Sequence, residues 1–203
     1  LIYHEQRSKI VIVPNGVDQV YFSPSSVEKK YDLVFTGNMN YPPNIDASIF
    51  LVREIMPLVW KSKPDATVQL AGANPHTSVM ALASERVKVT GWVNDIRDCY
   101  HISRIFVAPM RTGTGLQNKL LEAMAVKLPC ITTTISFTPL NADAPKDILV
   151  GNTKEEIASH ILFLLQNPDK AELIAKSGFD FVTGTYSIRH SFQILETVFT
   201  QTA

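Results

Sequence analysis

The stretch Gly113-Thr-Gly-Leu-Gln-Asn-Lys-Leu-Leu-Glu-Ala-Met-Ala125 is the most informative part of this chain, together with the apolar run Ile105-Phe-Val-Ala108 that precedes it. The run predicts a buried strand, the glycines predict a loop, and the residues from Gln117 onward have the composition and apolar spacing of a helix packed on a sheet. A strand that leads through such a loop into a helix presents unpaired N–H groups and the positive end of the helix dipole at the sheet's edge. A phosphate group can bind at such a place.

Two charged residues of this helix are candidate site residues. Lys119 lies in the first turn, where a cation opposes the helix dipole unless an anion occupies that end. Glu122 lies one turn further on the same face and could accept hydrogen bonds from hydroxyls attached to that anion, as ribose is attached to a diphosphate. The alternative is a surface Lys–Glu pair worth about 0.2–0.5 kcal/mol. The spacing alone favours neither interpretation.

Short apolar runs alternate with helical patterns along the rest of the chain, which is typical of parallel βαβ units. We expect sheet strands at residues 32–36, 67–71, 87–90, 105–108, 129–132 and 147–150, and a separate first strand at 9–13. We expect further helices at residues 44–61, 77–84, 95–102, 154–166, 169–178 and 187–200. The pattern predicts an α/β fold: a doubly wound, Rossmann-like parallel sheet of about six strands with helices on both faces.

Glycines follow three of the expected strands directly, at Gly37, Gly72 and Gly91. Ligands of open α/β sheets bind outside the carboxyl ends of the strands, where glycine lets the backbone approach closely. The alternative is that glycine only makes a tight turn, and we favour this interpretation for Gly72.

Composition excludes several classes of function. The 203 residues hold 19 basic and 19 acidic side chains, and no long basic cluster indicates a nucleic-acid or polybasic membrane surface. Cys99 and Cys130 stand apart without a CxxC pattern, which favours reduced, buried thiols, and the five histidines are scattered. We expect no metal and no cofactor. The sequence has no apolar run long enough to span a membrane and no leader pattern, so we expect a cytoplasmic protein.

The chain starts at Leu1 rather than Met, and we interpret it as a piece of a longer protein. We expect residues 1–30 to be a linker and an edge strand from a missing N-terminal domain, and residues 31–186 to be the binding domain. Residues 187–203 are expected to form a C-terminal helix with an apolar stripe at Ile188, Phe192, Leu195 and Phe199. Such a stripe packs on its own domain or docks on the missing one.

Several motifs in order resemble one family. The stretches are Pro14-Asn-Gly-Val-Asp18, residues 35–44, residues 89–93, Ala108-Pro-Met-Arg111, residues 115–125 and Leu128-Pro-Cys-Ile-Thr132. With them the chain resembles, over nearly its whole length, the C-terminal half of a GT-B-fold retaining glycosyltransferase of family four. Residues 118–125 are similar in particular to bacterial sugar transferases of the hexosyltransferase type that build exopolysaccharides and related surface glycans.

The resemblance implies that the chain binds a nucleotide-diphosphate sugar as co-substrate, without a metal. Glu122 would take the ribose hydroxyls, and the backbone at Trp92 and Val93 would face the base. The implied donor-binding residues are Gly37, Asn38, Asn40, Gly91, Trp92, Val93, Gly113, Thr114, Gly115, Leu116, Gln117, Asn118, Lys119 and Glu122. The implied catalytic residues are Lys119, Glu122 and Arg111.

The chain departs from the family pattern at two places. Thr114 stands where family members commonly carry a glutamate that touches the donor sugar. Residues 38–41 are Asn-Met-Asn-Tyr, where an Arg and a Lys often neutralise the diphosphate. Lys119 is therefore our first candidate for the diphosphate cation, and Arg111 is the second.

The implied reaction is transfer of a glycosyl group, with retention, to a glycan or lipid-linked acceptor held by the missing N-terminal domain. The full-length protein could associate peripherally with a membrane. We expect the piece alone to bind nucleotide but to transfer poorly or not at all. The alternatives are a GT-B nucleotide-sugar epimerase and a non-catalytic nucleotide-sugar-binding module. A dinucleotide oxidoreductase is disfavoured, because Asn118 replaces the third glycine of its fingerprint and the loop follows the fourth strand rather than the first.

Overall fold

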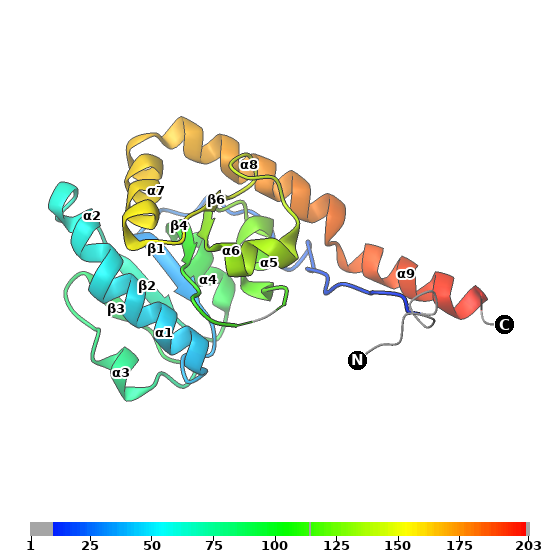
Figure 1. Ribbon diagram of the computed structural model, residues 1–203, viewed down its shortest axis with the longest axis horizontal. Coiled ribbons are helices and arrows are strands. Elements are labelled where there is room, and N and C mark those ends of the chain that lie inside the picture. Colours follow the sequence, from blue (N-terminus) through cyan, green and yellow to red (C-terminus); the bar gives the residue numbers. More distant parts are fainter. Residues whose placement is uncertain (1–9, 114, 202–203) are drawn as a thin grey trace.

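Six parallel strands form the single sheet of the computed structural model, which describes residues 10–113 and 115–201 (Figure 1). The strands are β1 (Tyr31–Thr36), β2 (Val68–Ala71), β3 (Val87–Val89), β4 (Ser103–Ala108), β5 (Cys130–Thr132) and β6 (Leu149–Val150). Their order in the sheet is β3-β2-β1-β4-β5-β6. The predicted α/β class and doubly wound parallel sheet are confirmed.

Helices cover both faces of the sheet. They are α1 (Pro42–Phe50), α2 (Met56–Ser62), α3 (Thr77–Met80), α4 (Ile96–His101), α5 (Asn118–Ala125), α6 (Thr134–Phe137), α7 (Lys154–Gln166), α8 (Pro168–Thr185) and α9 (Ile188–Gln201). With this strand order, the right-handed rule for βαβ units puts the connections from β1 to β3 on one face and those from β3 to β5 on the other. The outer helices add to these layers, since α7 packs on α2 and α8 packs on α5.

The expected helix at residues 44–61 exists, but π-helical turns at Leu51–Ile55 divide it into α1 and α2. Pro57 follows these turns closely. A regular helix would direct a hydrogen bond from residue 57 to the carbonyl of Arg53, and proline has no N–H to donate. The widened turn accommodates this missing bond.

The core lies on both sides of the two central strands, β1 and β4. Leu33, Phe35, Ile105 and Phe106 are all fully or almost fully buried, as expected for parallel strands that are covered on both faces. At the end of the neighbouring strand, an ideal Cβ on Gly72 would lie 1.8 Å from the carbonyl oxygen of Gly37. This close approach supports the interpretation of Gly72 as a packing residue.

The separate strand expected at residues 9–13 is not found. Lys9 lies outside the described residues, and residues 10–13 have no strand structure. The sheet ends at β3 and β6, and neither pairs with this segment, so its β-branched residues have no ladder to join. Ile12 is 81% exposed. The chain that follows this segment is joined to the start of the C-terminal helix region by an isolated parallel bridge between Val17 and Ser187.

Helix α8 is longer than expected. We predicted an end at Gly178, but the helix continues to Thr185. An ideal Cβ on Gly178 would lie 2.7 Å from the carbonyl oxygen of Asp147. The glycine therefore serves close packing of the helix and does not terminate it. The short α6 and the 3-10 turn after it (Thr138–Leu140) were not predicted.

The C-terminal helix α9 runs away from the sheet, with the N-terminal part of the described chain beside its start (Figure 1). Of its apolar stripe, Phe192 is 60% exposed and Ile188 is exposed too. Packing of this part of the stripe on its own domain is therefore not found, and docking on a further domain stays a prediction. Within the described residues, no helix is both long and apolar enough to cross a membrane.

Candidate functional site

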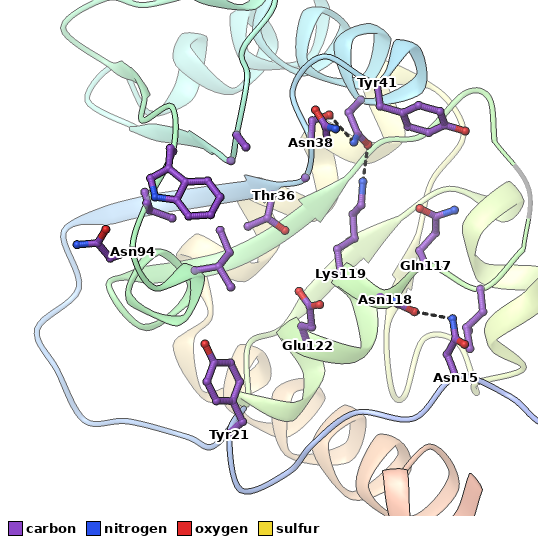
Figure 2. Close-up of a pocket in the computed structure, with 18 residues that line it drawn as sticks. Asn15, Tyr21, Thr36, Asn38, Tyr41, Asn94, Gln117, Asn118, Lys119 and Glu122 are labelled. Carbon is purple, nitrogen blue, oxygen red and sulfur yellow. Dashed lines mark hydrogen bonds between the residues drawn. The ribbon is translucent and has the colours of Figure 1, made fainter.

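A cleft of about 640 Å³ opens at the carboxyl ends of β1 to β4 (Figure 2). It lies at the switch point of the sheet, where connections from β1 run toward β2 and those from β4 run toward β5. Ligands of open α/β sheets bind at such a place. The lining residues are Asn15, Tyr21, Thr36, Gly37, Asn38, Tyr41, Asn44, Gly72, Ala73, Trp92, Val93, Asn94, Ile96, Leu116, Gln117, Asn118, Lys119 and Glu122.

Helix α5 begins at this cleft. Gln117 precedes its first turn in an extended conformation, and among the described residues no side chain caps the start of the helix. The first N–H groups of a helix have no partner within the helix. The Leu120 N–H bonds the Gln117 carbonyl at 2.9 Å, which leaves the N–H groups of Asn118 and Lys119 for a ligand in the cleft, with the positive end of the helix dipole behind them.

Lys119 points into the cleft from this first turn (Figure 2). Its Nζ donates to the side-chain oxygen of Asn44 at 2.5 Å and lies 4.7 Å from the centre of the Phe35 ring. Burial lowers the pKa of Lys119 to about 8, and the nearby charge of Glu122 partly opposes this effect. Because Lys119 is half-buried and reaches Asn44 on α1, it does not form the surface pair with Glu122 that the spacing allowed.

Glu122 is joined to a buried hydroxyl pair. Tyr100 Oη donates to Glu122 Oε2 at 2.7 Å and lies 2.7 Å from Thr36 Oγ1. Burial raises the pKa of Glu122, while the hydrogen bond from Tyr100 and the charge of Lys119 lower it. Burial, followed by the negative charge of Glu122, raises the pKa of Tyr100 well above its ordinary value. Tyr100 therefore stays protonated and serves as a donor.

The opposite wall is formed by the loop after β3 and by the N-terminal segment. Trp92 in that loop is 76% exposed, so its indole ring is available to a planar ligand. Tyr21 faces the cleft from the segment before β1 (Figure 2). The Arg97 guanidinium lies 3.8 Å from the centre of the Tyr21 ring. The same guanidinium holds the pKa of Asp95 down to about 2 by hydrogen bonding.

The structure brings together most of the expected donor-binding residues. Gly37, Asn38, Trp92, Val93, Leu116, Gln117, Asn118, Lys119 and Glu122 line the cleft. Asn40, Gly91, Gly113 and Gly115 belong to the same loops but are not among the lining residues. Thr114 lies outside the described residues.

Arg111, the second candidate for the diphosphate cation, lies away from the cleft. Its guanidinium binds the Asp46 carboxylate at 3.0 and 2.5 Å and lies 3.7 Å from Glu54. It also stacks over the Phe50 ring at 4.4 Å. Arg111 is thus paired with carboxylates on α1 and the following π-helical turns and is not among the residues that line the cleft. Its role toward the diphosphate stays a prediction.

Several lining residues were not expected from the sequence. Thr36, Tyr41 and Asn44 lie in the family-like stretch 35–44, but no charge marked them as site residues. Tyr21 and Asn94 lie outside the stretches that carry the resemblance. Asn15 Nδ2 donates to Asn118 Oδ1 at 3.0 Å. It belongs to the motif that begins at Pro14, so order along the chain could have indicated it. Tyr100 supports the site from behind, and no local pattern indicated it.

The described residues include no group of three or more His, Cys, Asp or Glu side chains that could hold a metal ion. The carboxylates near the cleft are engaged with hydroxyls or guanidinium groups. Cys99 and Cys130 are buried and form no disulfide.

The chain has relatives among known proteins. The family model described as "Glycosyl transferases group 1" matches residues 30–167. An uncharacterised 44.6 kDa protein in the cps region of Klebsiella pneumoniae is 24% identical, over 93% of this chain and 51% of that protein. The chain thus spans about half the length of this curated relative.

Solved structures share the fold. The C-terminal domain of the glycosyl transferase group 1 family protein LpcC from Francisella tularensis has a TM-score of 0.67 and 23% identity, over 85% of this chain and all of that one. Anabaena Alr3699/HepE in complex with UDP-glucose has a TM-score of 0.74 and 15% identity, over 91% of this chain and 56% of that one.

Proposed function

Because this chain belongs to the glycosyl transferases group 1 family and has the fold of a GT-B glycosyltransferase domain, we propose that its cleft binds the donor, a nucleotide-diphosphate sugar. The observation that carries the proposal is the position of Lys119. A half-buried ammonium group lies in the first turn of a helix without a side-chain cap among the described residues, at the switch point of the sheet. A cation is unfavourable at this end of a helix unless an anion joins it.

The diphosphate would lie against the start of α5. First-turn N–H groups and Lys119 would bind its oxygens, and the partly apolar cleft would strengthen these contacts because it excludes water. When the bond from the anomeric carbon to the β-phosphate oxygen breaks, its electron pair stays on the leaving diphosphate. The same fixed donors would stabilise that developing charge.

The nucleoside would extend from the diphosphate toward β3. Glu122, one turn along α5 from Lys119, would accept hydrogen bonds from the ribose hydroxyls through Oε1, since Tyr100 occupies Oε2. The loop with Trp92 and Val93 would face the base. The complex of Alr3699/HepE with UDP-glucose supports this class of ligand for the fold. We assign no residue of this chain to the donor sugar.

Transfer itself needs an acceptor, which we place on the part of the protein beyond this chain. The acceptor hydroxyl would form the new bond to the anomeric carbon, with retention, and its proton would pass to a base or to the departing phosphate. The relative in a cps region supports a polysaccharide or lipid-linked acceptor. We expect the 203-residue chain alone to bind nucleotide without transferring sugar.

Calorimetric titration with UDP, GDP, ADP, CDP and dTDP tests the proposal. We expect one of these to bind with a stoichiometry of one per chain, and we expect added Mg²⁺ to leave the affinity unchanged. Absence of binding by all five would contradict the proposal. Sugar transfer by this chain alone would contradict only the assignment of the acceptor site.

One observation favours a second candidate, a non-catalytic nucleotide-sugar-binding module. Asn38 and Asn40 stand where the family resemblance leads us to expect basic residues, so the cleft has less positive charge for a leaving diphosphate. Release of nucleoside diphosphate by the longer protein, given candidate acceptors, separates the two. A transferase releases it only with an acceptor, an epimerase changes the sugar without one, and a module does neither.

A further inference from the structure

We propose that Tyr100 is a positioning residue for the donor site: its buried hydroxyl fixes which carboxylate oxygen of Glu122 faces the cleft. This inference rests on the proposed nucleotide function of that cleft. Tyr100 itself does not line the cleft. It would act only through Glu122.

The hydrogen bonds around Tyr100 have one direction. An ionised carboxylate can only accept, and a phenol has a single proton to donate. The 2.7 Å contact with Glu122 Oε2 therefore uses the Tyr100 proton, and Thr36 must donate in the 2.7 Å contact between the two hydroxyls. The result is a chain of donors that runs from Thr36 at the end of β1, through Tyr100 on α4, to Glu122 on α5.

The Tyr100 ring is held so that this direction cannot change easily. The side chain is fully buried. Phe106 on β4 lies 5.8 Å away, and Phe22 packs edge-on at 6.3 Å, measured between ring centres. A buried hydroxyl in a close-packed core has few alternative rotamers. Oε2 is therefore fixed against the core, and Oε1 is left for a ligand.

The same hydrogen bond favours the charged form of Glu122, which burial disfavours. Tyr100 and Lys119 are the titratable groups that act on this carboxylate, and Cys130 on β5 acts on Tyr100 from behind. Loss of the Tyr100 hydroxyl should therefore raise the pKa of Glu122. A protonated Glu122 would be a poorer acceptor for ribose hydroxyls.

The test compares Tyr100→Phe with a matched control, Tyr186→Phe. Both tyrosines are buried, and Tyr186 donates to the Leu140 carbonyl at 2.8 Å, away from the cleft. Phenylalanine keeps the ring contacts at both positions, and thermal unfolding checks that each variant folds. A third variant, Thr36→Val, removes the first donor of the chain.

Two readouts are measured for each variant. Carbon NMR of labelled glutamate follows the titration of Glu122, assigned with Glu122→Gln, and calorimetry follows UDP binding from about pH 5 to pH 8, above the ordinary glutamate pKa of about 4.3. We expect Tyr100→Phe to raise the titration midpoint of the Glu122 carboxyl. We also expect it to lower the affinity for UDP about tenfold, as for loss of a hydrogen bond to a charged group. The loss should be larger at low pH. Thr36→Val should show a smaller change in the same direction, and Tyr186→Phe should show none.

The two ways of failing are distinguishable. If the folded wild-type chain binds no nucleotide of the panel, the proposed function fails, and the NMR titration still decides whether Tyr100 acts on Glu122. If the wild type binds UDP or another nucleotide of the panel, but Tyr100→Phe leaves both its affinity and the Glu122 midpoint unchanged, the positioning role is wrong. If Tyr186→Phe changes the nucleotide affinity and the Glu122 midpoint as much as Tyr100→Phe does, the effect would be one of general packing and the positioning role would be wrong.

Discussion

The ammonium group of Lys119 lies 2.5 Å from the side-chain oxygen of Asn44, and this contact joins the first turn of α5 to α1 beneath the cleft. Asn44 is itself fixed, because its Nδ2 donates to the Asn38 carbonyl at 2.9 Å. An amide oxygen orients the ammonium group without neutralising it. The contact therefore keeps the charge of Lys119 available to an anion.

Lys119→Met should weaken nucleotide binding by about 10- to 100-fold, which is the range for loss of a hydrogen bond between charged partners. The free energy of unfolding of the unbound chain should not fall, because the variant removes a buried charge. Calorimetry and thermal unfolding measure the two effects. Arg111→Met should leave affinity unchanged, since Arg111 is paired with Asp46. Equal losses in both variants would show that the anion lies elsewhere.

Binding and stability should respond to alkaline pH in opposite directions. Because the pKa of Lys119 is about 8 in the folded chain and about 10.4 in an unfolded one, the unfolded chain holds more protons between these values. The contribution of Lys119 to the free energy of unfolding therefore rises with pH between these two pKa values. Nucleotide affinity falls over the same range, because the ammonium group loses its charge. The difference between wild type and Lys119→Met, measured at each pH, isolates both effects. An affinity difference that stays constant from pH 7 to pH 10 would contradict the assignment.

Glu122→Gln should weaken nucleotide binding by about 1.5–3 kcal/mol, the value of a hydrogen bond to a charged group. The amide oxygen can still accept from Tyr100, so folding should barely change. Glu172→Gln is the matched control, because Glu172 pairs with Lys127 at 3.6 Å outside the cleft. A Glu122→Gln variant that unfolds, while its folded fraction binds normally, would show a structural role instead.

Gly72→Ala should destabilise the chain by about 3 kcal/mol or more, because the new Cβ meets backbone that cannot move alone. Its ideal position lies 1.8 Å from the Gly37 carbonyl oxygen. Gly91→Ala is the comparison: its φ is +69°, but no atom lies within 4 Å of the added Cβ. In Gly91→Ala the loss of stability therefore comes from the left-handed backbone conformation alone and is about 1–2 kcal/mol. Equal unfolding temperatures for the two variants would contradict the close approach.

Local patterns predicted much of this fold because the deciding features are local. Each sheet strand contains buried apolar residues, although Lys88 in β3 and Arg104 in β4 are exposed. Helix α7 spans the predicted residues 154–166. Gly178 misled the prediction of α8, because a glycine that packs a helix closely looks the same in sequence as one that ends it. Residues 10–13 have the composition of a strand, but composition does not supply a neighbouring strand to pair with.

The candidate site was only partly predictable for a similar reason. Lys119 and Glu122 lie on one helix, so periodicity could place them on one face. Tyr100 and Asn44 reach the same two residues from 22 and 75 positions away. Such contacts depend on the order of the strands, which no single motif encodes. Arg111 was a candidate because of its neighbouring loop, but its partner Asp46 on α1 lies 65 positions away, and no local pattern indicated that ion pair.

The most direct test of the central claim is a crystal structure of this chain with the best-binding nucleoside diphosphate. We expect phosphate oxygens within hydrogen-bond distance of Lys119 Nζ and of the first backbone amides of α5, with the ribose hydroxyls on Glu122. Density for the nucleotide outside this cleft, or in the cleft with its diphosphate turned away from α5, would contradict it.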